Sequence, residues 1–186
     1  INNPEHIPEY YFKVNDIIFG KDGDFSDLDK VIKLSSWLRN NVKGGSGLSE
    51  TSDQALKLMI KGNAGVCSDM SQIFNNFCVI NNLKVREWGT TSAPFNKKYG
   101  GHSFNEVYIK ELQKWIFIDV SYSILFYGED ETPLSVLELF QRKRDNKKVH
   151  YKNFCENKDL SKKNINKNYL NKSVKLFQKD LIYLYN

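Results

Sequence analysis

The sequence GHSFNEVYIKELQKWIFIDV occupies residues 101–120 and alternates between apolar and polar side chains in two segments, 101–109 and 114–120. Alternation with a period of two is typical of β-strands, and the short connection between the segments predicts a β-hairpin. One face of this hairpin is aliphatic and the other is polar and aromatic. The aliphatic face carries Val107, Ile109, Ile116, Ile118 and Val120, and the other carries His102, Phe104, Glu106, Tyr108, Trp115, Phe117 and Asp119.

The register of the hairpin depends on where its turn is centred. A turn centred between Lys110 and Glu111, or a four-residue loop 109–112 with the same centre, places His102 directly opposite Asp119. Their Cβ atoms would then lie about 4.5–5.5 Å apart, close enough for an imidazole N–H to bond a carboxylate. A slip of one residue would put them on opposite faces. The sequence therefore predicts a His102–Asp119 pair.

A second stretch, residues 62–74, has two glycines in a loop, followed by apolar residues at helical spacing from Cys67 to about Ile80. The first turn of a helix has free backbone N–H groups and the positive end of the helix dipole, which favour a thiolate and can hold a developing oxyanion. Cys67 is therefore placed as a nucleophile, although free cysteines are also often simply buried. Cys78 lies about three turns deeper in the same helix and is predicted to be core.

These residues can work together chemically. A histidine held by a carboxylate has a fixed tautomer and a stabilised imidazolium, as a base serving a thiol nucleophile requires. Of Cys67, Cys78 and Cys155, only Cys67 stands at a helix start. We therefore expect Cys67, His102 and Asp119 to form one site; the alternative is that each is an ordinary core or surface residue.

Other segments predict further elements around these two features. We expect helices at 26–43, 51–61 and 133–143, the last with Thr132 as its cap, and strands at 83–91 and 149–154. Residues 120–132 and 156–173 are expected to be loops, 174–185 a strand pair or a helix, and 1–24 mixed, with a short strand or helical turn at 10–18.

Length and charge limit the class of protein. The 186 residues fit a single domain, 1–186, with enough apolar residues for a core. Residues 141–180 contain 13 Lys and Arg against 4 Asp and Glu, although the net charge of the whole chain is only +5. A basic segment can bind a polyanion, but it is more often a solvated surface, so nucleic acid is not the expected partner.

Cysteine spacing and hydropathy exclude other classes. Three cysteines without C-x-x-C spacing argue against a disulfide framework and a zinc ribbon. The acidic pairs at 22–24 and 27–29 lack calcium-loop spacing, so no metal or other cofactor is predicted. No apolar run is long enough to span a membrane, and no targeting segment is visible. The chain starts at Ile1 instead of methionine, which is compatible with a signal or anchor having been removed upstream.

Three blocks of the sequence carry a resemblance. Residues 65–69 (GVCSD), 101–108 (GHSFNEVY) and 115–119 (WIFID) match, in order, a G-x-C helix start, an H-x-aromatic-x-E strand and a W-x-x-x-D strand. This arrangement resembles the transglutaminase-like superfamily, and the match covers about residues 28–125. Phe104 stands where the family usually has tryptophan, which keeps an aromatic ring but removes an indole N–H.

The resemblance implies a fold and a chemistry. The fold would be a papain-like α+β core, with the nucleophile helix packed on an antiparallel sheet and a basic C-terminal extension at about 141–186. Cys67 would be the nucleophile, His102 the general base and acid, and Asp119 the residue that orients His102. The reaction would be acyl transfer on a protein or peptide amide through a thioester. Hydrolysis is favoured over cross-linking because the chain shows no accessory domain or calcium loop.

The surroundings of the nucleophile and the function itself leave alternatives. The second oxyanion donor could be Gln54 or Trp37, although Gln54 also fits a helix-capping role and Trp37 a core position inside a helix. Phe104 is a further candidate for the substrate site. The alternative function is a catalytically silent binding or scaffold module that keeps the fold and docks an acidic partner through its basic segment.

Overall fold

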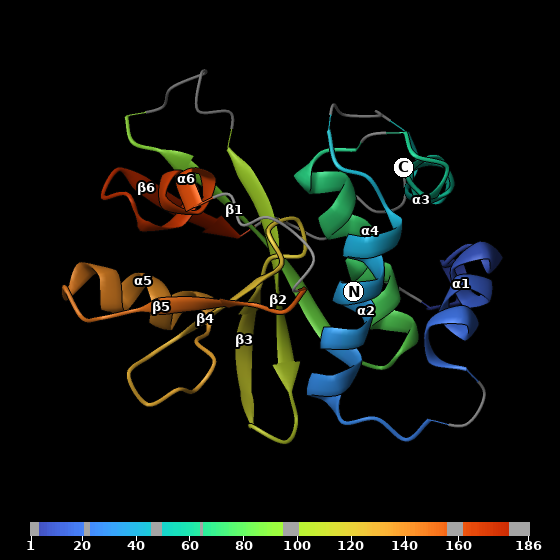
Figure 1. Ribbon diagram of the computed structural model, residues 1–186, viewed down its shortest axis with the longest axis horizontal. Coiled ribbons are helices and arrows are strands. Elements are labelled where there is room, and N and C mark those ends of the chain that lie inside the picture. Colours follow the sequence, from blue (N-terminus) through green and yellow to red (C-terminus); the bar gives the residue numbers. More distant parts are fainter. Residues whose placement is uncertain are drawn as a thin grey trace.

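The computed structural model describes residues 4–20, 23–45, 50–63, 65–94, 101–155 and 162–178. They form an α+β fold with helices and an antiparallel sheet (Figure 1). The helices are η1 (Pro4–His6), α1 (Glu9–Phe19), α2 (Asp27–Asn41), α3 (Ser52–Ile60), α4 (Cys67–Ile80), α5 (Val136–Arg144), α6 (Lys162–Ile165) and the π-helical turn η2 (Asn166–Leu170). The strands are β1 (Lys84–Ser92), β2 (His102–Ile109), β3 (Lys114–Ile118), β4 (Ile124–Tyr127), β5 (His150–Asn153) and β6 (Val174–Gln178).

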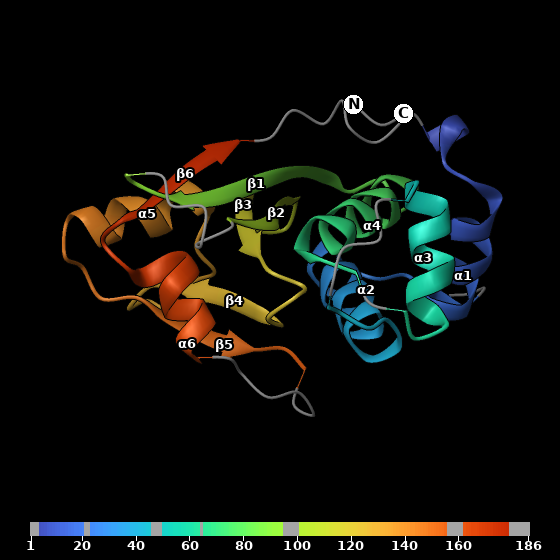
Figure 2. The same ribbon diagram turned by 90° about the horizontal axis from the view of Figure 1, so that it is seen from above.

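The central sheet has four strands in the order β3-β2-β1-β6, with antiparallel neighbours throughout. β4 and β5 form a separate antiparallel ribbon. Helices α1–α4 gather on one side of the molecule, and α5, α6, β4 and β5 lie on the other (Figure 2). The predicted architecture, a cysteine helix packed on an antiparallel sheet, is confirmed.

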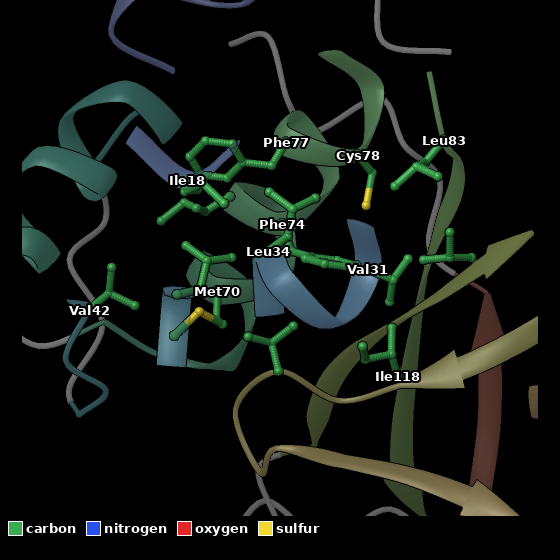
Figure 3. Packing of buried hydrophobic residues seen from close by; sticks show 14 of the residues in the cluster. Ile18, Val31, Leu34, Val42, Met70, Phe74, Phe77, Cys78, Leu83 and Ile118 are labelled. Atoms are coloured by element: carbon green, nitrogen blue, oxygen red, sulfur yellow. The ribbon is translucent and has the colours of Figure 1, made fainter. Parts of the chain in front are cut away.

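The aliphatic face of the hairpin packs against the helices, as predicted. All five aliphatic residues are buried and belong to one cluster with side chains of α1–α4. In Figure 3, Phe74 and Cys78 of α4 lie in this cluster with Val31 of α2 and Ile118 of β3. Burying such a side chain stabilises the fold by about 1.5–3 kcal/mol. Cys78 is therefore a core residue, as its place deep in α4 predicts.

The opposite face of the sheet is covered as well. Phe104 and Phe117 are fully buried in a second cluster with Phe126 of β4, Leu139 of α5 and Tyr169 of η2. The C-terminal part of the chain therefore closes this face. The sheet is buried on both sides, which fixes the hairpin between two apolar layers.

The predicted hairpin register is wrong by two residues. β2 and β3 pair Glu106 with Phe117, and the loop between the strands spans residues 110–113. Continued along the strands, this register places His102 diagonally across from Asp119 instead of directly opposite. Because side chains alternate with a period of two, a two-residue shift keeps every residue on its predicted face.

Several predicted elements differ from the structure. α5 begins at Val136, three residues later than predicted, because Ser135 and Glu138 form the capping box and Thr132 is not the cap. Residues 9–19 form a full helix, 124–127 form β4 where a loop is predicted, and 162–170 are helical where a loop is predicted. Residues 174–178 form a strand, and the rest of 174–185 lies outside the described residues.

Asn105 ties β2 to α4 inside the core. Its buried Nδ2 donates to the Ser71 carbonyl at 3.1 Å and to Asn75 Oδ1 at 2.8 Å. Asn105→Ala is expected to lower the free energy of unfolding by about 1–3 kcal/mol, because buried acceptors lose their donor. Urea denaturation measures this loss. Asn41→Ala, which removes an exposed amide that donates to the Trp37 carbonyl, should change stability by less than about 0.5 kcal/mol. Equal losses in the two variants would contradict the role of Asn105 in joining β2 to α4.

Candidate active site

Cys67 is the first residue of α4, and the loop before it is shaped for this position. Gly62 has a φ of +92°, a conformation that favours glycine. A Cβ on Gly65 would lie 2.6 Å from the sulfur of Met59, so a larger residue there would require the buried Met59 side chain to move. The Asp69 carboxylate accepts a hydrogen bond from the Val66 N–H at 2.7 Å and so caps the helix start. This explains the G-x-C pattern physically.

His102 and Asp119 form a buried pair on one face of the sheet. The distance from His102 Nε2 to Asp119 Oδ2 is 2.8 Å, and both side chains are at least 95% buried. Asp119 is held by a backbone bridge to Ile124, and its Oδ1 accepts a hydrogen bond from the Tyr122 N–H at 3.1 Å. The predicted His102–Asp119 pair therefore exists, although through a diagonal contact.

The start of α4 brings Cys67 to the other side of the imidazole. The Cys67 thiol lies close enough to the ring of His102 for the two side chains to interact, and the Ser103 N–H donates to Cys67 Sγ at 3.3 Å. Since Nε2 is engaged by Asp119, the ring nitrogen left for the thiol is Nδ1. The structure therefore brings together the three residues that the sequence predicts as one site.

The electrostatics of the site favour a thiolate and an imidazolium. Burial raises the pKa of Cys67, but the hydrogen bond and charge of His102, with the Ser103 N–H, outweigh it and leave the pKa lowered. Burial lowers the pKa of His102, but the charge and hydrogen bond of Asp119, followed by those of Cys67, raise it to about 9. Burial raises the pKa of Cys78 well above the usual thiol range, so this cysteine stays protonated.

A cavity of about 760 Å³ gives access to these groups. Cys67, His102 and Tyr122 line it, together with Gly65 and Arg39. A volume of this size accommodates a peptide side chain or a short backbone segment. The Cys67 N–H, in the first turn of α4, is available to hold an oxyanion formed there.

The remaining predicted site residues lie elsewhere. Gln54 is exposed on α3, and Trp37 packs against the helical core; neither lines the cavity. Phe104 is only 1% exposed and packs against Phe117, with ring centroids 4.9 Å apart. Its ring therefore fills the core beneath the site.

Two residues near the site are not predicted from the sequence. Tyr122 stacks on His102, with ring centroids 4.6 Å apart and an interplanar angle of 11°. The Tyr169 hydroxyl donates to Asp119 Oδ2 at 2.5 Å. Tyr122 follows Asp119 by three residues, so proximity in the sequence could have suggested it, but Tyr169 has no such signal.

The part of the chain that the structure describes holds no group of three His, Cys, Asp or Glu side chains placed to bind a metal ion. Within the same residues, the helices are too short or too polar to cross a membrane.

Comparisons with known proteins identify the family of the chain. A family model described as the transglutaminase-like superfamily matches residues 15–120, which include Cys67, His102 and Asp119. A search of curated proteins found no match. One similar solved structure is a candidate cysteine protease from Cytophaga hutchinsonii, with a TM-score of 0.47 and 18% sequence identity. The match covers 92% of this chain and 52% of that one, so this chain spans about half the length of that structure. The family match, which covers more than half of the sequence, shows that the chain belongs to the transglutaminase-like superfamily.

Proposed function

We propose that this protein is a cysteine-dependent enzyme that transfers the acyl group of a protein or peptide amide through a thioester on Cys67. One arrangement carries the proposal. Cys67 and His102 lie beside each other in the wall of one cavity, and Asp119 is bonded to the far side of the His102 ring. Membership of the transglutaminase-like superfamily supports a cysteine enzyme in general.

The geometry suggests a two-step reaction. The Cys67 thiolate attacks the amide carbonyl, and the Cys67 N–H stabilises the oxyanion as the C–S bond forms. The C–N bond then breaks, and the His102 imidazolium gives its proton to the departing amine. In the second step water or an amine attacks the thioester and gives a proton to His102. The C–S bond breaks and the thiolate is regenerated, while Asp119 holds the imidazole in place throughout.

The acceptor in the second step decides the overall reaction. Attack by water gives hydrolysis of the amide, and attack by an amine gives transamidation. We propose hydrolysis as the main reaction.

The reactivity of Cys67 tests the proposal without a known substrate. We expect iodoacetamide to alkylate Cys67 at about pH 6.5 at least about tenfold faster than it alkylates glutathione, because the lowered pKa gives Cys67 a larger fraction of thiolate than an ordinary thiol has. Amide turnover should then fall as pH rises through about 9, where His102 loses the proton that it donates. Mass spectrometry of the three cysteine peptides separates Cys67 from the buried Cys78 and Cys155.

The opposite result would favour the alternative function. If Cys67 reacts no faster than glutathione, and His102→Ala leaves its rate unchanged, the enzyme proposal fails. A binding module that docks an acidic partner through the basic 141–186 region would then be the better account.

A further inference from the structure

The Asp119 carboxylate has a hydrogen-bond donor from far along the chain. Its Oδ2 accepts from His102 Nε2 at 2.8 Å and from the Tyr169 hydroxyl at 2.5 Å. Tyr169 lies in η2, 50 residues after Asp119 and outside the family match at residues 15–120. The oxygen that holds the imidazole is therefore shared with a residue from the C-terminal part of the chain.

Tyr169 is fixed tightly enough to act on this oxygen. Its side chain is fully buried, and burial together with the charge of Asp119 raises its pKa well above the usual value, so the hydroxyl keeps its proton and donates. Lys143 of α5 donates from Nζ to the Tyr169 carbonyl. The ring packs edge-on against Phe104, Phe117 and Phe126.

The same segment also supports the second aromatic neighbour of His102. Asn168 Nδ2 donates to the Tyr122 hydroxyl at 2.7 Å, and Tyr122 stacks on the imidazole. The Tyr169 ring meets the imidazole edge-on, with centroids 5.7 Å apart and an interplanar angle of 80°. Two consecutive residues of η2 therefore support His102: Asn168 through the stacked Tyr122, and Tyr169 by direct edge-on contact. Single π-helical turns are frequent at functional sites.

We propose that Tyr169 is a positioning residue that tunes His102 through Asp119, an inference that rests on the proposed function. The hydroxyl fixes Oδ2 towards the imidazole and spreads the negative charge of the carboxylate over a second hydrogen bond. A carboxylate with this extra donor stabilises the imidazolium less than a bare one would. His102 therefore remains acidic enough to give its proton to a departing amine.

A purely structural role would depend on the ring, and a tuning role depends on the hydroxyl. Tyr169→Phe separates the two because it keeps the ring and its packing. Tyr151→Phe is the matched control, since Tyr151 packs against Phe126 in the same cluster and has no hydrogen bond to Asp119.

The direct readout is the titration of His102, followed by NMR in protein labelled with ¹⁵N-histidine. The chain has three histidines, so His6 and His150 serve as internal references. Tyr169→Phe is expected to raise the pKa of His102 by about half a unit or more, because the carboxylate loses a donor and binds the imidazolium more strongly. The midpoint of Cys67 alkylation should move to lower pH, since a more stable imidazolium favours the thiolate. Tyr151→Phe should change neither value.

The same substitution made in an Asp119→Ala variant shows whether Tyr169 acts through Asp119. In Asp119→Ala, Tyr169→Phe should leave the His102 titration and the alkylation midpoint unchanged, because the two residues would form one coupled unit. Unchanged values on Tyr169→Phe in the otherwise natural chain, or a fall in the pKa of His102, would overturn the inference, even if thermal stability drops.

Failure of the proposed function would look different. If Cys67 is no more reactive than glutathione but Tyr169→Phe still raises the pKa of His102, the enzyme proposal fails and the coupling of Tyr169 to His102 stands. If Cys67 is reactive and the variant titrates like the natural protein, only the role of Tyr169 is wrong.

Discussion

Replacing His102 by alanine is expected to slow the alkylation of Cys67 at about pH 6.5 by at least about tenfold, and the turnover of an amide substrate by about 10²–10⁴-fold. The hydrogen bond and charge of His102 are what lower the pKa of Cys67 against its burial. Without them, burial is opposed only by the Ser103 N–H, so the pKa of the thiol rises and a smaller fraction of it is thiolate at this pH. Stopped alkylation reactions, analysed by mass spectrometry of the Cys67 peptide, give the rate.

His150→Ala is a suitable control for this experiment. His150 lies on β5, and its Nε2 contacts Glu131 at 3.2 Å, a partly exposed pair away from the cavity. Its removal should leave the rate at Cys67 unchanged. A rate that is equally low in both variants would point to a general loss of structure and contradict a specific role of His102.

Glu106→Ala is expected to lower the free energy of unfolding by about 3–5 kcal/mol, the largest stability effect that we foresee. This carboxylate has no exposed surface. Its Oε2 accepts from Arg86 Nε at 2.6 Å and from Trp88 Nε1 at 2.9 Å, and its Oε1 accepts from the Val136 N–H at 2.7 Å. Alanine would leave these donors without their acceptor, next to a charge that is no longer paired.

Urea denaturation measures this effect, with Glu9→Ala as the control. Glu9 forms an ion pair with Lys13 at 3.0 Å in which both side chains are mostly exposed, and such pairs contribute less than about 1 kcal/mol. Glu106→Gln keeps an acceptor oxygen and should fall between the two. A loss at Glu106 no larger than that at Glu9 would show that the three hydrogen bonds do not stabilise the sheet.

The sequence predicts the faces of the hairpin better than its register. Alternation assigns each side chain to a face, and this assignment survives any shift by two residues. The register depends on the turn, which spans residues 110–113 and ends with Gln113 at a φ of +50°. Glutamine gives no signal for a left-handed conformation, whereas glycine or asparagine would have done so.

In the candidate site, too, the sequence predicts what local patterns determine and misses what distant contacts determine. Cys67 and His102 are recognisable because local rules place them at a helix start and on a strand face. Tyr169 is not recognisable, because its contact with Asp119 joins distant parts of the chain, and its neighbours are the Lys- and Asn-rich residues typical of a loop. The helices at 162–170 form because Ile165 and Tyr169 find a buried surface that exists only in the folded protein.

The late position of η2 in the chain has a consequence for biosynthesis. Translation delivers residues 15–120, with Cys67, His102 and Asp119, well before it delivers the hydroxyl that completes the environment of the carboxylate. A nascent chain that stops short of residue 162 would contain the nucleophile and its base but not their final electrostatic setting. If Tyr169 tunes His102 as proposed, such a chain would hold the imidazolium more strongly than the finished protein does, so the balance between thiolate and proton donor is set only when this last segment has been made.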